Sequence, residues 1–136
     1  MMLLVRHAWA GHADKWDGDD RLRPLDKRGR KQAAALVPLL RRFEIDRIVS
    51  SPYVRCIETV KPLARGLGIE INLDDALGEE FQGSRGAELV RTLLPTAAVA
   101  CCHGGLAELV CGESLKKGET FALDERARVL KRLRPD

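Results

Sequence analysis

Short, uninterrupted apolar segments alternate with longer amphipathic segments along this chain, and this alternation limits the fold more than any other feature. The run Ala97–Cys102 contains no polar residue except its thiols, and Met1–Val5 is similarly apolar. Segments of this length and character are typical of strands buried on both faces of a sheet. Because helical patterns lie between them, we expect a mostly parallel sheet with helices on both faces. The predicted class is therefore α/β, with three layers.

The predicted elements follow in alternating order. Strands are predicted at Met1–Val5, Arg47–Ser50, Ile69–Leu73 and Ala97–Cys102, with an edge strand at Thr120–Leu123. Helices are predicted at Leu25–Arg42, Pro52–Arg65, Ser84–Leu94 and in a short segment ending at Gly112. Pro38 is expected to kink or end the first helix. Ser51 is expected to cap the second helix, and Gly66 and Gly68 to close it.

Length and composition bound the remaining classes. With 136 residues, we expect a single domain over residues 1–136. A content of 45% hydrophobic and 32% charged residues excludes disorder throughout. No apolar run reaches the roughly 18 residues of a membrane span, and the apolar start meets Arg6 and His7 too early for a secretory signal. The net charge of +3 is too small to indicate a dedicated nucleic-acid-binding module, and we expect no membrane partner.

The cysteine pattern speaks against two kinds of thiol chemistry. The four cysteines are expected to be reduced thiols in the cytoplasm, with Cys101 and Cys102 in the core. No CxxC pair supports a zinc ribbon, and neither the spacing of histidines and cysteines nor a carboxylate partner supports another zinc site. A cysteine-dependent phosphatase needs an arginine to close its phosphate loop, but the sixth residue after Cys102 is Glu108.

Cationic and imidazole side chains follow three of the predicted strands. Arg6 and His7 end the first, Arg55 lies one turn into the helix after the second, and His103 follows Ala97–Cys102. Ligands of open α/β sheets bind beyond the carboxyl ends of the strands, so these side chains are expected at one edge. Guanidinium groups and N–H donors suit a phosphoryl group, and a neutral imidazole is a nucleophile for phosphorus.

The ordered motifs around these residues resemble the histidine phosphatase superfamily, which has a phosphoglycerate mutase-like fold. The motifs are Leu4-Val5-Arg6-His7-Ala8, Arg23-Pro24-Leu25 with Arg28-Gly29-Arg30, the block from Ser50 to Thr59, and Cys102-His103-Gly104. The resemblance extends from residue 3 to about residue 123. Within the superfamily, the short chain resembles the SixA-type phosphohistidine phosphatases. It also resembles the histidine-phosphatase domains that follow a Nudix domain in certain bacterial nucleotide-pool enzymes.

The resemblance implies a role for each residue of the cluster. His7 matches the nucleophile that becomes phosphorylated, and Arg6 and Arg55 match the arginines that bind the phosphoryl oxygens. His103 matches the second histidine, which binds the phosphoryl group and stabilises charge during transfer. The family needs no metal, and we expect no cofactor.

An acidic residue near the end of Ala76–Phe81 matches the family's general acid, which protonates poor leaving groups. Glu79 is the better match by its distance from Leu77, and Glu80 is the alternative. The alternative to both is that these are solvated loop residues. A phosphohistidine substrate has a better leaving group and does not require the acid.

The substrate side of the site is less defined by the sequence. Arg21, Arg23, Lys27 and Glu80 are candidates for its rim. Trp9–Ala13 lacks the hydroxyl residue and asparagine that many members use as further phosphate contacts, and His12 is read as a surface residue. The expected partner is a phosphorylated small molecule or a phosphohistidine protein. The alternatives are a nucleotide phosphatase like the Nudix-linked relatives and a non-catalytic protein of the same fold that binds a phosphorylated ligand.

Overall fold

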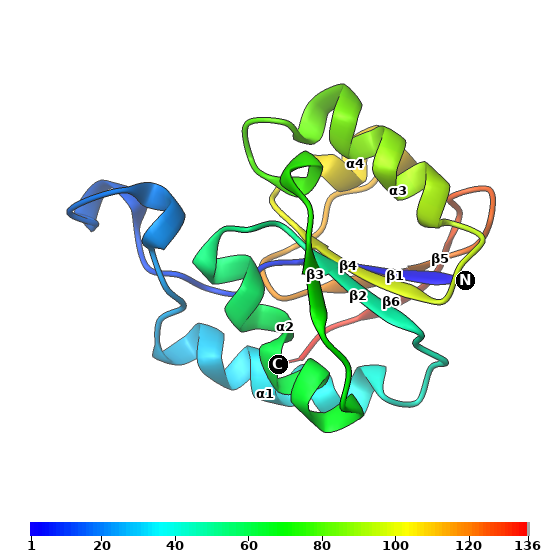
Figure 1. The fold of residues 1–136 in the computed structure, drawn as a ribbon, viewed down its shortest axis with the longest axis horizontal. Helices are drawn as coiled ribbons and strands as arrows, with labels where there is room; N and C mark the ends of the chain where they lie inside the picture. Colours follow the sequence, from blue (N-terminus) through cyan, green and yellow to red (C-terminus); the bar gives the residue numbers. More distant parts are fainter. Residues whose placement is uncertain (136) are drawn as a thin grey trace.

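A computed structural model, which describes residues 1–135, contains a six-stranded sheet with the order β3-β2-β4-β1-β5-β6 (Figure 1). The strands are β1 (Met2–Arg6), β2 (Arg47–Ser50), β3 (Ile71–Leu73), β4 (Ala98–Cys102), β5 (Thr120–Leu123) and β6 (Val129–Leu133). The helices are α1 (Lys27–Leu40), α2 (Val54–Leu67), α3 (Ala87–Leu93) and α4 (Leu106–Cys111). Among these residues, no helix is long and apolar enough to cross a membrane.

The sheet separates two helical layers. Figure 1 shows α1 and α2 on one face and α3 and α4 on the other. The strands β1 to β4 pair in parallel, whereas β5 pairs antiparallel with β1 and β6 antiparallel with β5. The predicted α/β class, with a mostly parallel sheet covered on both faces, is therefore confirmed.

The side chains of β1 show how the sheet is buried on both faces. Met2 and Leu4 pack in the apolar cluster that includes α3 and α4, while Leu3 and Val5 pack in the cluster that includes α1 and α2. This alternation follows from the two-residue period of a strand. A strand with apolar side chains on both faces needs a layer of helices on each side to bury them.

The structure corrects the predicted edge of the sheet. Thr120–Leu123 forms a strand as expected, but it lies between β1 and β6 and is not the edge. The sequence reasoning missed β6, in which only Leu133 is buried. Leu130, Lys131 and Arg132 are all exposed, so the strand lacks the alternation of apolar and polar residues that marks a half-buried strand.

The boundaries of α1, α2 and α3 differ from the prediction. Helix α2 begins at Val54, two residues later than predicted, because the hydroxyl of Ser51 faces His103 and does not cap the helix. Gly66 lies inside α2, and Gly68 ends it in the left-handed conformation, with φ of 68°. Pro38 does not stop α1, which continues to Leu40. A π turn over Gln82–Gly86 replaces the predicted first turns of α3.

The strand order brings three chain segments to one edge. Strand β4 pairs with β2 on one side and β1 on the other, and all three run in the same direction. Their carboxyl ends therefore lie together, followed by His7, by the Ser51–Tyr53 loop and by His103. A candidate site at this edge is built from β1, β2 and β4 and their following loops.

Candidate active site

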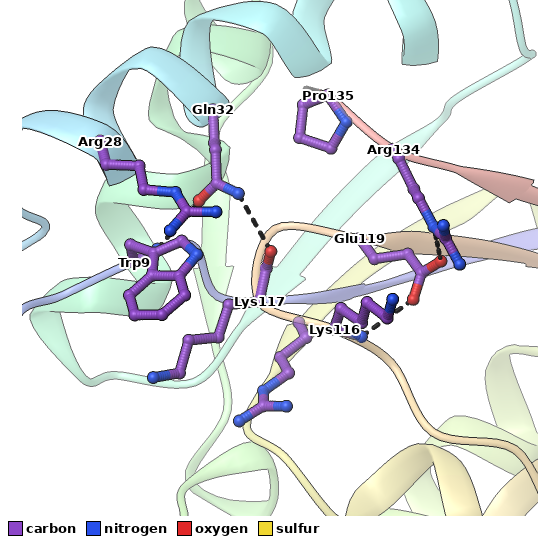
Figure 2. A pocket seen from close by; sticks show the side chains of 9 residues that line it. Trp9, Arg28, Gln32, Lys116, Lys117, Glu119, Arg134 and Pro135 are labelled. Carbon is purple, nitrogen blue, oxygen red and sulfur yellow. Dashed lines mark hydrogen bonds and ion pairs between the residues drawn. The ribbon is translucent and has the colours of Figure 1, made fainter.

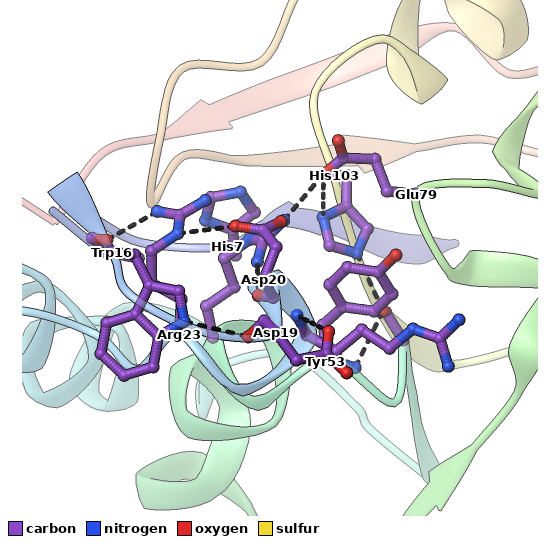
Figure 3. Close-up of polar contacts among 12 residues, drawn as sticks. His7, Trp16, Asp19, Asp20, Arg23, Tyr53, Glu79 and His103 are labelled. Atoms are coloured by element: carbon purple, nitrogen blue, oxygen red, sulfur yellow. Dashed lines mark hydrogen bonds and ion pairs between the residues drawn. The ribbon is translucent and has the colours of Figure 1, made fainter. Parts of the chain in front are cut away.

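The residues selected from the sequence meet at the carboxyl edge of the sheet. The rings of His7 and His103 lie 5.4 Å apart, centroid to centroid, and at 64° to each other. His7, Arg55 and His103 are buried, and Arg6 is half-buried. Figure 3 shows His7 and His103 near Asp20 and Glu79, which come from two other segments.

The hydrogen bond of His7 fixes its tautomer. The Nδ1 atom lies 2.8 Å from the backbone oxygen of Ala8, which can only accept, so Nδ1 carries the proton. Burial lowers the pKa of His7 to about 4; the bond to Ala8 opposes this shift, and the charges of Arg55, Arg6 and Lys117 add to it. His7 is therefore neutral at neutral pH, with the lone pair on Nε2.

Ser51 orients the second imidazole. Its Oγ accepts the backbone N–H of Tyr53 at 3.2 Å and lies 2.9 Å from Nε2 of His103. The hydroxyl proton can thus be donated to Nε2, which leaves the ring proton of His103 on Nδ1, 3.4 Å from Glu79 Oε2. Burial, followed by the charges of His7 and Arg55, lowers the pKa of His103 to about 3.

Two carboxylates hold the buried guanidinium of Arg55. Its Nη1 donates to the backbone oxygen of Asp20 at 2.8 Å, and its Nη2 lies 3.1 Å from Asp20 Oδ2 and 2.7 Å from Glu79 Oε2. Burial alone would raise the pKa of Asp20, but hydrogen bonds and charges from Arg23 and Arg55 hold it below its usual value. Asp20 is therefore ionised, and its carboxylate fixes the orientation of the Arg55 guanidinium.

The two candidate acids point to different partners. Glu79 contacts Arg55 and lies beside His103, and its side chain is 54% exposed. Glu80 accepts the hydroxyl proton of Tyr53 at 2.8 Å and lies 3.7 Å from Arg21. Burial, followed by the hydrogen bond to Glu80, raises the pKa of Tyr53 to about 12. Only Glu79, of these two residues, reaches both a proposed phosphoryl ligand and the second histidine.

Buried donors without partners gather at this site. Among residues 1–135, four buried side-chain nitrogen or oxygen atoms lack a hydrogen-bond partner, and three of them belong to this site: Arg6 Nε, Arg55 Nε and His103 Nδ1. The 3.4 Å contact of His103 Nδ1 with Glu79 is not a hydrogen bond. Arg6 is held by donation from Nη1 to the backbone oxygen of Leu115 at 2.9 Å. A Cβ atom on Gly104 would lie 2.8 Å from Arg6 Cζ, so glycine is needed for this close approach. Unpaired buried donors are costly, and an anion with several oxygens would satisfy them.

The predicted rim residues are spread around the site. Arg23 donates to Asp20 Oδ1 at 2.9 Å and to the backbone oxygen of Ala10 at 2.6 Å, so it supports the loop that holds Asp20. Arg21 lies beside Glu80 and is mostly exposed. Lys27 is exposed at the start of α1, and His12 is exposed as expected.

Sequence reasoning missed Asp20 and Ser51 as site residues. Asp20 was one of several acidic residues in a short stretch, and nothing in its spacing separated it from a solvated carboxylate. Ser51 carried a clear signal for a polar contact, but the Ser-Pro pair was interpreted as a helix cap. Both residues act through contacts to positions more than thirty residues away.

The thiols and the metal-binding residue types form no separate centre. The four cysteines are free, and Cys56, Cys101 and Cys102 are buried. Burial raises the pKa of the Cys102 thiol, so it is not poised as a thiolate. Within the described part of the chain, no group of three or more histidine, cysteine or acidic residues is arranged to hold a metal ion.

Residues 2–117 match the sequence profile of the Histidine phosphatase superfamily (branch 1). The chain therefore belongs to this superfamily. The 8-oxo-(d)GTP phosphatase of Mycolicibacterium smegmatis is 38% identical to it over 128 residues, which cover 88% of this chain. The chain spans only 40% of the length of that relative.

Solved structures show the same fold. A protein assigned as the phosphohistidine phosphatase SixA of Agrobacterium tumefaciens has a TM-score of 0.77 and 23% identity, over 99% of this chain and 97% of that one. The protein histidine phosphatase SixA complexed with tungstate has a TM-score of 0.75 and 19% identity, over 98% of this chain and 96% of that one. The predicted phosphoglycerate mutase-like fold agrees with these neighbours.

Proposed function

We propose that this protein hydrolyses a phosphorylated substrate through a covalent intermediate on His7. The observation that carries this proposal is the neutral His7 imidazole, whose Nδ1 is committed to Ala8 while its Nε2 retains a lone pair. The buried donors of Arg6, Arg55 and His103 surround the same site. A phosphoryl group placed among these donors would present its phosphorus to a nucleophile that needs no deprotonation.

The first step transfers the phosphoryl group to His7. Nε2 donates its lone pair to phosphorus, and the bond from phosphorus to the leaving-group oxygen breaks. Arg6, Arg55 and His103 stabilise the charge on the equatorial oxygens. Glu79, when protonated, gives its proton to the departing oxygen, and its position between Arg55 and His103 supports this role.

The second step regenerates the free imidazole. The Glu79 carboxylate accepts a proton from water while the water oxygen bonds to phosphorus. The bond from phosphorus to Nε2 then breaks, its electron pair returns to the ring, and inorganic phosphate leaves.

Two substrate classes have support of different kinds. The fold neighbours include proteins named as phosphohistidine phosphatases, and an imidazole leaving group suits a site with a half-exposed acid. The relative at 38% identity is named as an 8-oxo-(d)GTP phosphatase, which favours a nucleotide substrate.

We also place the protein in the reducing cytoplasm, because Cys56, Cys101 and Cys102 are buried free thiols.

A metal-free substrate panel with His7→Ala and His12→Ala variants tests the proposed function. The panel holds a phosphohistidine protein, nucleoside di- and triphosphates, sugar phosphates and an aryl phosphate. Turnover should fall by several orders of magnitude in His7→Ala, and acid-labile phosphoenzyme should form in the wild type and His12→Ala only. Full activity of folded His7→Ala would overturn the mechanism. Phosphate binding without any turnover would favour the non-catalytic alternative.

A further inference from the structure

A second pocket, of about 310 Å³, shares Arg6 with the candidate active site. It lies where the end of β1, helix α1, the turn before β5 and the segment after β6 meet (Figure 2). Its lining residues come from four separate segments of the chain: Arg6, Trp9, Arg28, Gln32, Lys116, Lys117, Glu119, Arg134 and Pro135. Neither the sequence motifs nor the proposed chemistry uses this pocket as a whole.

Positive charge dominates the pocket lining. Five of the residues are arginines or lysines, and Glu119 is the single carboxylate among them. Glu119 is buried, and its Oε2 lies 2.9 Å from Arg134 Nε, so its negative charge is paired with Arg134. Cationic side chains thus outnumber carboxylates among the lining residues, which favours an anionic ligand.

Two of these cations contact the same aromatic ring. The Arg28 guanidinium and the Lys117 ammonium each lie 4.3 Å from the centroid of the Trp9 ring (Figure 2). Burial lowers the pKa of Lys117, and the charges of Arg6, Arg23 and Arg28 lower it further. The neighbouring cations thus disfavour the charge on Lys117, and an anion bound beside Lys117 would offset their effect.

Hydrogen bonds connect the pocket wall to the backbone of the active site. Buried Gln32 accepts the N–H of Trp9 and donates to the backbone oxygen of Lys117, each at 3.1 Å. The N–H of Gly118 lies 3.1 Å from the backbone oxygen of Arg6 and 3.0 Å from that of His7. Lys117 and Trp9 are thus fixed relative to the proposed nucleophile before any ligand binds.

We propose that this pocket holds a second phosphoryl group of the substrate, joined by a bridging oxygen to the group that His7 removes. This inference rests on the proposed function and names its substrate class: compounds with a pyrophosphate link, such as nucleoside di- and triphosphates. Adjacent phosphoryl groups are close enough for one guanidinium to contact both, and Arg6 lines both sites.

The pocket also changes the chemistry of the leaving group. When Nε2 of His7 bonds to phosphorus, the bond to the bridging oxygen breaks and its electron pair stays on the second phosphoryl group. The extra negative charge then lies beside Arg6 and Lys117. These cations stabilise it, and the departing phosphate is less dependent on protonation by Glu79 than an alkoxide would be.

Calorimetric titration with two phosphonates tests the subsite without relying on turnover. Methylenediphosphonate carries two linked groups and cannot be hydrolysed, whereas methylphosphonate carries one. The wild-type chain, in EDTA buffer, should bind methylenediphosphonate at least about tenfold more tightly, as one further charge-assisted contact predicts. Lys117→Gln and Arg28→Gln should lose most of this preference. Lys61→Gln removes the same charge from α2, away from the pocket, and should keep it.

The outcomes separate this inference from the proposed function. Equal affinity for the two phosphonates, or equal behaviour of Lys117→Gln and Lys61→Gln, overturns the subsite. If phosphoenzyme still forms on His7 in that case, the proposed function stands. If neither phosphonate binds and no phosphoenzyme forms on His7, both proposals fail. Turnover of a phosphohistidine protein that depends on Lys117, without preference for methylenediphosphonate, would identify the pocket as a protein-docking face and overturn the inference.

Discussion

At the residue scale, the neighbours Glu79 and Glu80 are distinguished by their partners, and this leads to a prediction about leaving groups. Glu79→Gln should reduce turnover of an alkyl phosphate by about 10²–10⁴-fold. The same variant should lose less than about tenfold on an aryl phosphate, whose leaving group needs little protonation. Steady-state rates on the two substrates check this.

Glu80→Gln provides the matched control, because Glu80 bonds to Tyr53 and not to Arg55. Its rates should not depend on the leaving group in this way. If Glu79→Gln loses the same factor on both substrates, Glu79 only positions Arg55 and is not the acid.

The sequence located some residues of the site and not others, for a physical reason. Arg6 ends a buried strand, and His7 and His103 directly follow buried strands, so local patterns alone place them at one edge of the sheet. Asp20 begins a short 3₁₀ turn (Asp20–Leu22) without apolar periodicity, and its contact with Arg55 joins positions 35 residues apart. Such contacts depend on tertiary structure, and no local pattern specifies them.

At the scale of elements, the docking of α1 against the loop after β1 leads to a stability prediction. Asp26 caps α1 by accepting the N–H of Gly29 at 2.8 Å, and its own N–H donates to the backbone oxygen of Trp9. A Cβ atom on Gly29 would lie 1.9 Å from that oxygen. Gly29→Ala should therefore lower the free energy of unfolding by about 1–3 kcal/mol, measured by urea denaturation.

Gly66→Ala is the matched control for this change, since Gly66 also lies inside a helix. Its added Cβ would meet only Val37 Cγ1, at an ordinary 3.5 Å. Because alanine favours the helix over glycine, this variant should be neutral or stabilised by up to about 1 kcal/mol. Similar destabilisation of both variants would show that close packing at Gly29 is not the cause.

Elements were predictable from the sequence where their burial was strong. The strands β1 and β4 are almost entirely apolar, and β2 contains the apolar pair Ile48-Val49. The predicted positions of all three agree with the structure to within a residue or so. Strand β6 buries mainly Leu133 and pairs on one side only, so its sequence carries no alternation strong enough to detect. The start of α2 was misplaced because Ser51 serves the site in place of the helix.

At the scale of the whole molecule, the fold keeps two imidazoles buried and neutral, and stability is lost in acid as a result. Burial lowers the pKa of His7 to about 4 and that of His103 to about 3, from 6.5 in an unfolded chain. Between pH 7 and pH 4 the unfolded chain takes up protons that the folded chain does not. The free energy of unfolding should therefore fall, by about 2 kcal/mol for each histidine at pH 5.

Urea unfolding at pH 7 and pH 5 measures this loss, and two variants assign it. His7→Asn should lose about 2 kcal/mol less between the two pH values than the wild type, because its share of the proton uptake is gone. His12→Asn changes an exposed histidine and should keep the wild-type difference.

The lowered pKa of His7 also predicts the pH dependence of catalysis. Since the free nucleophile is already neutral at pH 6, kcat/KM should not fall as the pH drops through 6.5, the ordinary pKa of histidine. A fall of kcat/KM centred near pH 6.5 would contradict a buried, neutral His7. So would a His7→Asn variant whose free energy of unfolding falls between pH 7 and pH 5 as much as that of the wild type.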